Sequence, residues 1–219
     1  MDSGHTLPLV NGPSPTQGET RPLDFIRHGS TKYNNTVGDQ PPGDADKIRG
    51  HIDVPLDDRG REEAKKVGQK LCNIKDRPAL LVSSDLSRAR ETAHIISRIC
   101  GIPVGGSLPS LRPWNLGKLQ GQESAKVAPI IKQLAENPDR SAPGGGDSFH
   151  QFLHQFFGGL KQVLAHPQRI AMVAHHRNER AIAAMEKGNW QTLDLKEFAR
   201  HGDRPGSMVT FSIPTAWLS

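Results

Sequence analysis

Apolar runs and helical periodicities alternate along most of the chain. Short apolar runs bounded by turn residues predict strands at 23–28, 79–83, 108–111, 169–174 and 208–213. Between them, apolar residues that recur every three or four positions predict helices at 57–73, 86–99, 123–136, 148–164 and 178–187. Strands that alternate with helices favour a mainly parallel sheet with both faces covered. We therefore expect an α/β fold, a three-layer α/β/α sandwich.

The clearest helical pattern follows the Gly-rich loop at 141–146. Asp147 or Ser148 is expected to cap this helix. Its apolar positions fall on one face: Phe149, Phe152, Leu153, Phe156, Leu160, Val163 and Leu164. An aromatic stripe at this spacing is typical of a packed core, so it gives no reason to expect a cofactor.

The chain of 219 residues, 35% of them apolar, is long enough for one sizeable core. Residues 1–21 are rich in Pro, Gly, Ser and Thr and lack apolar periodicity, so we expect a flexible N-terminal tail. Residues 22–219 are then a single catalytic domain. Within it, the loop at 31–55 is long and rich in Gly, Pro and Asp, which suggests a lid or mouth for a site.

The formal net charge of +5 does not indicate nucleic acid as a partner, because Lys and Arg are scattered among acidic residues and aromatic residues are few. An anionic small substrate accounts for the charge equally well. No apolar stretch approaches the ~18 residues that span a bilayer, and no signal peptide is recognisable, so we expect a cytoplasmic protein without a membrane partner. Cys72 and Cys100 lack metal or redox spacing and are expected to be free thiols. The sequence does not indicate an oligomeric state.

The candidate chemistry begins at Arg27-His28-Gly29, directly after the first apolar run. A strand that ends in this tripeptide places an imidazole at the carboxyl edge of the sheet, where open α/β sheets bind their ligands. The neighbouring guanidinium is suited to holding a phosphoryl group through two hydrogen bonds. Gly29 allows the backbone to turn close to that group. His28 is therefore the candidate nucleophile, although a strand-end His is more often an ordinary polar residue.

Five segments, in order, raise this interpretation well above a chance match. They are Arg27–Gly29, Gly50–Leu56 with Asp57–Gly60, Val82–Ala93, Leu111–Gly121 and Ala171–Arg180. Together they resemble the histidine phosphatase superfamily, the phosphoglycerate-mutase-like proteins, over most of the chain. The resemblance implies phosphoryl transfer through a phosphohistidine on His28.

The resemblance also implies roles for other residues. Arg27 and Arg88 match the arginines that clamp the phosphate, although Arg88 has an alternative role as a salt-bridge partner of Glu91 or Asp85. Asn34 matches a position that contacts phosphate through its amide, and a turn-forming Asn is the other interpretation. His175 matches the second histidine, which donates a hydrogen bond to the phosphoryl oxygens. Arg180 is expected to be mainly structural.

The chain departs from the family at the acid that protonates the leaving group. Members of the mutase and phosphatase branches usually carry a glutamate where this chain has Pro113, which cannot exchange a proton. His176 stands where the acid-phosphatase branch has an acidic aspartate, so it is the candidate catalytic acid if the backbone directs it inward. Asp53 and Glu123 are weaker candidates.

The function expected is a phosphatase that hydrolyses small phosphomonoesters, with no cofactor and no metal. A metal pair at His175-His176 is not expected, because adjacent strand residues point to opposite faces and no carboxylate stands at ligand spacing. The loss of the glutamate leaves open a slow enzyme or a non-catalytic member that binds phosphorylated ligands. A mutase is less expected, because the chain lacks that branch's longer insertions and its glutamate.

Overall fold

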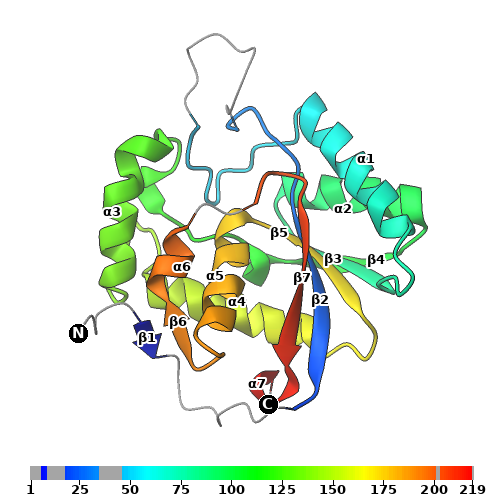
Figure 1. The fold of residues 1–219 in the computed structure, drawn as a ribbon. Coiled ribbons are helices and arrows are strands. Elements are labelled where there is room, and N and C mark those ends of the chain that lie inside the picture. Colours follow the sequence, from blue (N-terminus) through cyan, green and yellow to red (C-terminus); the bar gives the residue numbers. More distant parts are fainter. Residues whose placement is uncertain (1–5, 9–17, 35–45, 201–202, 219) are drawn as a thin grey trace.

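The computed structural model describes residues 6–8, 18–34, 46–200 and 203–218. Its central sheet has five strands in the order β4-β3-β5-β2-β7 (Figure 1). These strands are Val104–Leu108, Leu80–Ser84, Ile170–Ala174, Thr20–Arg27 and Met208–Pro214. The first four are parallel, and β7 alone pairs antiparallel, with β2. The expected mainly parallel sheet is confirmed.

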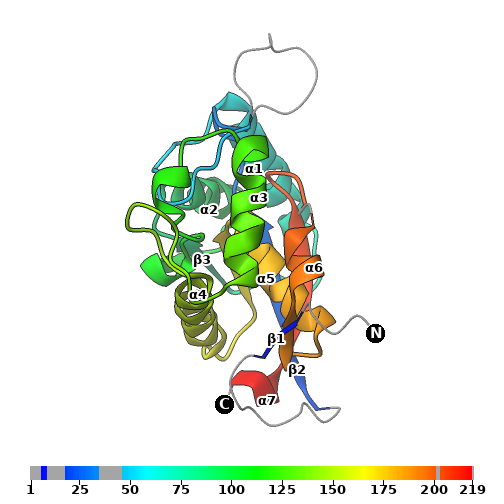
Figure 2. The same ribbon diagram turned by 90° about the vertical axis from the view of Figure 1, so that its left-hand side faces the viewer.

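Helices cover both faces of the sheet, as a three-layer sandwich requires (Figures 1 and 2). On one face lie α1 (Asp58–Cys72) and α2 (Ser87–Cys100). The other carries α3 (Ser124–Glu136), α4 (Phe149–Leu164) and α5 (His176–Lys187). Because successive side chains of a strand point to opposite faces of the sheet, each strand packs against both layers of helices. Phe25 and Met172 pack with α3, α4 and α5, whereas their neighbours Ile26 and Val173 pack with α1 and α2.

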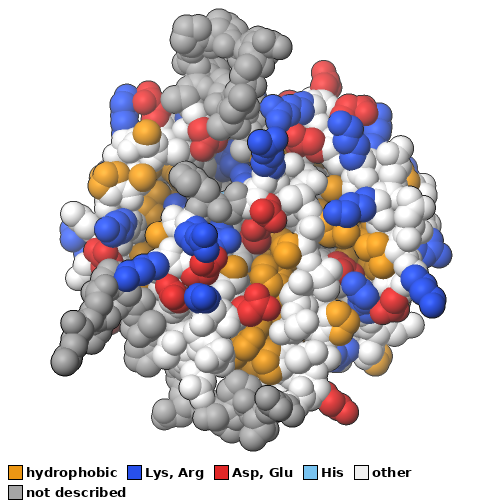
Figure 3. Space-filling view, in the orientation of Figure 1, with side chains coloured by type: hydrophobic (Ala, Val, Ile, Leu, Met, Phe, Trp, Pro, Cys, Tyr) orange, Lys and Arg blue, Asp and Glu red, His pale blue; other side chains and the backbone are white. Residues whose placement is uncertain are grey.

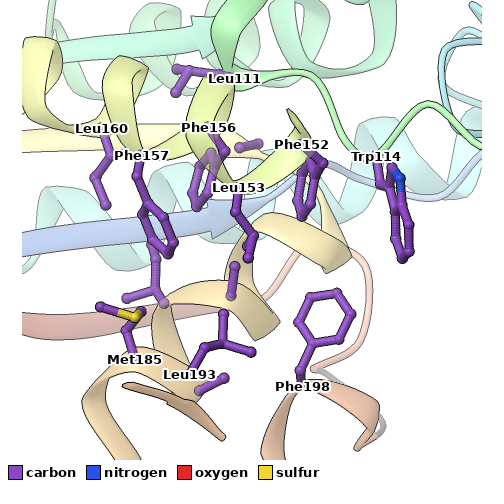
Figure 4. Packing of buried hydrophobic residues seen from close by; sticks show 14 of the residues in the cluster. Leu111, Trp114, Phe152, Leu153, Phe156, Phe157, Leu160, Met185, Leu193 and Phe198 are labelled. Carbon is purple, nitrogen blue, oxygen red and sulfur yellow. The ribbon is translucent and has the colours of Figure 1, made fainter. Parts of the chain in front are cut away.

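The aromatic stripe of α4 forms the centre of the larger core, as its spacing predicts. Phe156, Phe152 and Trp114 follow one another with ring centroids 6.1 and 6.0 Å apart (Figure 4). The helix begins with a capping box, in which the Ser148 hydroxyl accepts from the Gln151 amide and the Gln151 side chain accepts from the Ser148 amide. Of the two predicted caps, Ser148 is therefore the one used.

Several predicted boundaries were wrong. The strand expected at 108–111 lies earlier, at Val104–Leu108, and residues Pro109–Leu111 form a short 3₁₀ helix. Pro109 has no amide hydrogen for a sheet ladder, which explains why the strand stops there. Helix α5 begins at His176, two residues earlier than expected, with His175 as its N-cap. The remaining short elements were not predicted: Gly117–Leu119 (3₁₀), Thr192–Asp194 (β6), Leu195–Ala199 (α6) and Thr215–Leu218 (α7).

The expectation of a flexible tail over residues 1–21 was too broad. Strand β1 (Thr6–Pro8) pairs antiparallel with β6, and Thr20 and Arg21 belong to β2, where they pair with β7. Residues 1–5 and 9–17 lie outside the described residues, as do residues 35–45 of the expected lid. Cys72 and Cys100 are free thiols at the ends of α1 and α2, as expected.

Basic and acidic side chains are interspersed over the face shown in Figure 3, as their mixing along the sequence suggests. Among the helices that the structure describes, none combines the length and the apolar character needed to cross a membrane.

Candidate active site

The candidate site lies where three neighbouring parallel strands end. Arg27, the last residue of β2, is paired in register with Ala174, the last residue of β5. The next residues, His28 and His175, therefore leave the sheet side by side, and the His28 amide donates to the Ala174 carbonyl (3.1 Å). Strand β3, the other neighbour of β5, leads into α2, whose second residue is Arg88. The parallel register thus gathers residues that are distant in the sequence.

The ring of His28 is fixed in one tautomer. Its Nδ1 lies 2.7 Å from the Gly29 carbonyl oxygen, and a carbonyl only accepts, so Nδ1 carries the hydrogen. In the neutral ring, Nε2 then holds the free lone pair. Burial, followed by the charges of Arg88, Arg49 and Arg27, lowers the pKa of His28 well below its usual range. His28 is therefore neutral and nucleophilic at physiological pH.

His175 faces His28 across a short gap. The two ring centroids are 5.1 Å apart, with the rings inclined by 60°. His175 is 3% exposed, and neither of its ring nitrogens has a hydrogen-bond partner among the described residues. Because buried polar groups are nearly always paired, two unpaired nitrogens indicate a position that a ligand completes. Burial, and then the charges of Arg88 and His28, lower the pKa of His175 well below its usual range.

Three arginines surround the two rings. Arg27 donates to the Asp203 carbonyl, and Arg88 donates to the carbonyls of Ile52 and Gly50, both at 2.9 Å. The third, Arg49, was not identified from the sequence, although it directly precedes the Gly50–Leu56 block. It donates to the Thr31 hydroxyl (3.3 Å).

Carboxylates offset only part of the cost of burying these cations. Burial and the nearby Arg49 charge lower the pKa of Arg88 to about 9, and burial and Arg27 lower the pKa of Arg49 to about 10. Burial also lowers the pKa of Arg27, although four carboxylates oppose that shift. The Nε atoms of Arg27 and Arg88 have no hydrogen-bond partner within the described parts of the chain. Guanidinium groups that depress one another's pKa form a natural site for a multiply charged anion.

The salt bridges considered for Arg88 are not formed. Asp85 instead receives two hydrogen bonds from Arg112, at 2.8 and 2.6 Å, and Glu91 receives one from Arg61. The structural role expected for Arg180 agrees with its hydrogen bonds to the Glu197 carbonyl and carboxylate.

Asn34 forms the turn that is one of its two expected roles, and its contact with phosphate stays a prediction. Its side-chain oxygen accepts from the Thr31 amide (3.0 Å) and the Thr31 hydroxyl (3.3 Å), which closes a turn. The same side chain lines the cavity that contains His28 and Arg88. With the oxygen occupied by the turn, the amide nitrogen is the group that can donate to an anion.

His176 lies at the same cavity as His175, contrary to the expectation that adjacent residues point to opposite faces. The strand has already ended at this point: His175 is the N-cap of α5 and His176 its first residue, so the period of two does not apply. Burial and the charges of Arg177 and Arg27 lower the pKa of His176 well below its usual range. No cluster of three or more His, Cys, Asp or Glu side chains suited to a metal occurs in the described residues.

Pro113, at the position where the family resemblance implies a glutamate, lines the cavity. Its carbonyl accepts from His51 Nε2 at 2.9 Å. The weaker acid candidates lie elsewhere: the Asp53 carboxylate caps α2 through the Ser87 amide and hydroxyl, and Glu123 pairs with Lys126. Two carboxylates not identified from the sequence, Asp46 and Asp203, do line the cavity.

Comparison with known proteins agrees with this geometry. The family model described as histidine phosphatase superfamily (branch 1) matches residues 23–213. The chain belongs to the histidine phosphatase superfamily. Within the superfamily, it is 30% identical over 185 residues to a metal-independent phosphoserine phosphatase of Arabidopsis thaliana, covering 82% of this chain and 70% of that relative.

Two further comparisons point to the same superfamily. A glucosyl-3-phosphoglycerate phosphatase of Mycolicibacterium vanbaalenii is 36% identical over 131 residues, 58% of this chain and about half (53%) of the relative. The solved structure of a mycobacterial glucosyl-3-phosphoglycerate phosphatase in complex with VO₃ has a TM-score of 0.66 and 26% identity. That match covers 87% of this chain and 92% of the other.

Proposed function

We propose that this member of the histidine phosphatase superfamily is a phosphomonoesterase that works through a phosphohistidine on His28. The observation that carries the proposal is the pairing of His28 with His175 at 5.1 Å inside a ring of three arginines. A neutral imidazole with a free Nε2 supplies the nucleophile, and the cations stabilise the charge on the equatorial oxygens of the phosphoryl group.

The reaction then has two displacements at phosphorus. His28 Nε2 attacks, the P–N bond forms and the P–O bond to the alcohol breaks, so the leaving oxygen must receive a proton. Arg27, Arg49, Arg88 and the Asn34 amide hold the phosphoryl oxygens, and His175 donates a hydrogen bond to them. Water then attacks phosphorus, the P–N bond breaks and inorganic phosphate is released, which returns His28 to its neutral form.

We assign the proton for the leaving oxygen to His176, which lines the same cavity as Pro113. The glutamate that the family resemblance implies is replaced by Pro113, and among the acidic residues that the structure describes only Asp46 and Asp203 line the cavity. Asp46 already accepts from the Ser124 hydroxyl (2.9 Å). Burial and nearby arginines lower the pKa of His176, and the negative charge of a bound phosphate ester opposes that shift, so the imidazole can carry the proton when substrate is in place.

The substrate is a small phosphate ester. The cavity of about 400 Å³ falls within the ~300–1,000 Å³ usual for small-molecule sites, so it accommodates more than a phosphoryl group. The two curated relatives are named for phosphoserine and for glucosyl-3-phosphoglycerate, both small phosphate esters.

The test compares the wild type with His28→Ala during hydrolysis of p-nitrophenyl phosphate. Release of nitrophenolate by the wild type and its loss in His28→Ala are expected, with an acid-labile phosphorylated protein trapped by rapid quenching only when His28 is present. His154→Ala, which alters an exposed histidine on α4, is the matched control and should retain full activity.

Pro113 motivates a second candidate, a member that binds phosphorylated ligands without turnover. The same experiment separates the two. Binding of inorganic phosphate without any His28-dependent release of nitrophenolate would favour the binding protein and overturn the enzyme.

A further inference from the structure

Not every basic side chain at the cavity belongs to the clamp around the phosphoryl group, and Arg177 is the least exposed of those outside it that lie on α5 or α6. Arg177 is the second residue of α5, and it lines the same cavity as His28 and His176. Its guanidinium lies 5.5 Å from the centre of the Phe198 ring, which is itself buried against Phe149. The aromatic face holds the guanidinium in place but does not neutralise its charge.

Arg177 differs from the other arginines that α5 and α6 bring to this part of the molecule. Arg180, three residues later, is paired with the Glu197 carboxylate, and so is Arg200. No carboxylate of the described residues forms a salt bridge with Arg177, and burial alone lowers its pKa to about 10. Its place in the first turn of α5 adds to the cost, because the helix dipole there disfavours a cation.

From this arrangement we propose that Arg177 binds a second anionic group of the substrate, a carboxylate or a second phosphate, while the phosphoryl group to be transferred lies between His28 and His175. The inference rests on the proposed phosphatase function and narrows its substrate to phosphate esters that carry a second negative charge. A cation that is poorly solvated and unpaired in the free protein gains most from such a group.

The surroundings of Arg177 support an anion. Arg204 and Arg200 also line the cavity and are exposed, although Arg200 is paired with Glu197. The two cavity carboxylates are Asp203 and Asp46, of which Asp46 lies near Arg27 and Arg49. Apolar side chains complete the lining, among them Trp114, Leu116 and Ile131. A small ester with two anionic groups and an apolar part suits this mixed lining.

The second anion would also act on His176. The charge of Arg177 is the largest electrostatic cause of the lowered pKa of His176, after burial. An anion bound to Arg177 offsets that charge and raises the pKa of His176, so proton donation to the leaving oxygen becomes easier when the second group is in place. The substrate would thereby supply part of what the absent glutamate provides in relatives.

The experiment uses esters that differ only in the second anion. 3-Phosphoglycerate is compared with glycerol 3-phosphate, and propane-1,3-diol bisphosphate with propyl phosphate, so the two arms separate a carboxylate from a phosphate. The wild type is expected to prefer the dianionic partner of at least one pair by about 10–100-fold in kcat/KM, the range of a charge-assisted hydrogen bond. Arg177→Met should reduce that ratio to about one and leave the affinity for inorganic phosphate unchanged.

Arg98→Met is the control for net charge, because Arg98 is exposed in the last turn of α2. If the wild type shows nearly the same kcat/KM for both substrates of each pair, the proposal is overturned before any variant is measured. The proposal is also overturned if Arg177→Met lowers kcat/KM equally for both substrates of a pair. Should Arg177→Met fail to fold, Arg177→Gln replaces it.

Binding separates this proposal from the proposed function. In a His28→Ala background, calorimetric titration measures the same ligand pairs without turnover. A preference for the dianionic ligand that depends on Arg177 supports the second-anion site even if no ester is hydrolysed, and absence of that preference overturns it even if hydrolysis is observed.

Discussion

At the residue scale, the protonation state of each histidine follows from its surroundings, and this gives a prediction for His176. Because its pKa is lowered, the protonated form of His176, the donor, becomes populated only at pH values well below ~6.5, the usual value for His. His28, whose pKa is lowered as well, is neutral at pH values near and above ~6.5. Hydrolysis of an alkyl phosphate should therefore rise as pH falls, until His28 becomes protonated.

His176→Gln should abolish this rise and lower kcat for glycerol 3-phosphate by ~10²–10⁴-fold, the usual contribution of general acid catalysis. p-Nitrophenyl phosphate, whose leaving group needs no proton, should be hydrolysed at nearly the wild-type rate. The measurement is a pair of pH–rate profiles, one for each substrate. An equal decrease in kcat for the two substrates in His176→Gln would show that His176 is not the catalytic acid.

Most of the site residues predicted from the sequence stand in a recognisable segment at the end of a predicted strand or the start of a helix, whereas Asn34, in a loop, came from the family resemblance alone. Arg27, His28, Arg88 and His175 could be placed together because the ends of parallel strands meet at one edge. Arg49 lies in a loop without periodicity, so only the folded chain shows it beside Arg88. The side of the sheet on which His176 lies was not predicted correctly either, because it depends on the residue at which the strand ends and the helix begins.

At the scale of elements, the site depends on how closely α1 approaches the end of β2. A Cβ atom added to Gly60, at the start of α1, would lie 2.0 Å from the Ser30 carbonyl oxygen, and one added to Gly29 would lie 2.3 Å from the Gly60 carbonyl oxygen. The turn after His28 therefore rests directly on the backbone of the helix. The Ser30 amide and hydroxyl also donate to the Glu63 carboxylate of α1, at 2.7 and 3.0 Å.

Gly60→Ala is accordingly expected to destabilise the protein by ~1–3 kcal/mol, because the clash is with backbone and the helix or the turn must move. Helix propensity alone predicts the opposite sign, since Ala is favoured over Gly by ~1 kcal/mol. Gly158→Ala in α4 is the matched control. Gly158 is exposed with open space around it, so this substitution should raise the free energy of unfolding by ~0.5–1 kcal/mol. Denaturant unfolding of both variants measures the difference, and a stabilised Gly60→Ala protein would contradict the close contact.

Long elements with strong patterns were predictable, and short ones were not. Helix α4 shows its buried face and its cap in the sequence, so only the choice between two cap residues needed the structure. Strand β6 and helix α6 have three and five residues, too few for a period to be detected, and their structure depends on tertiary contacts. β6 also pairs with β1, from a segment whose composition indicates a flexible tail.

At the scale of the whole molecule, the site concentrates positive charge that nearby carboxylates neutralise only in part. Arg27, Arg49 and Arg88 each have a lowered pKa, and the two buried imidazoles between them are neutral for the same reason. Folding must therefore bury guanidinium groups, Arg49 beside Arg88 and Arg27, with carboxylates that offset only part of the cost. An anion that binds only the folded protein offsets more of this cost and shifts the folding equilibrium by mass action.

Inorganic phosphate at 100 times its Kd should raise the free energy of unfolding by ~2.7 kcal/mol. For a chain of this length that corresponds to an increase in Tm of about 5–11 °C, at ~2–4 °C per kcal/mol. Thermal unfolding in phosphate is compared with chloride at the same ionic strength, which removes the general effect of screening. Arg49→Met should show a smaller increase at the same phosphate concentration, because one of the three cations is gone. An equal Tm in phosphate and chloride would mean that the three arginines do not form an anion site.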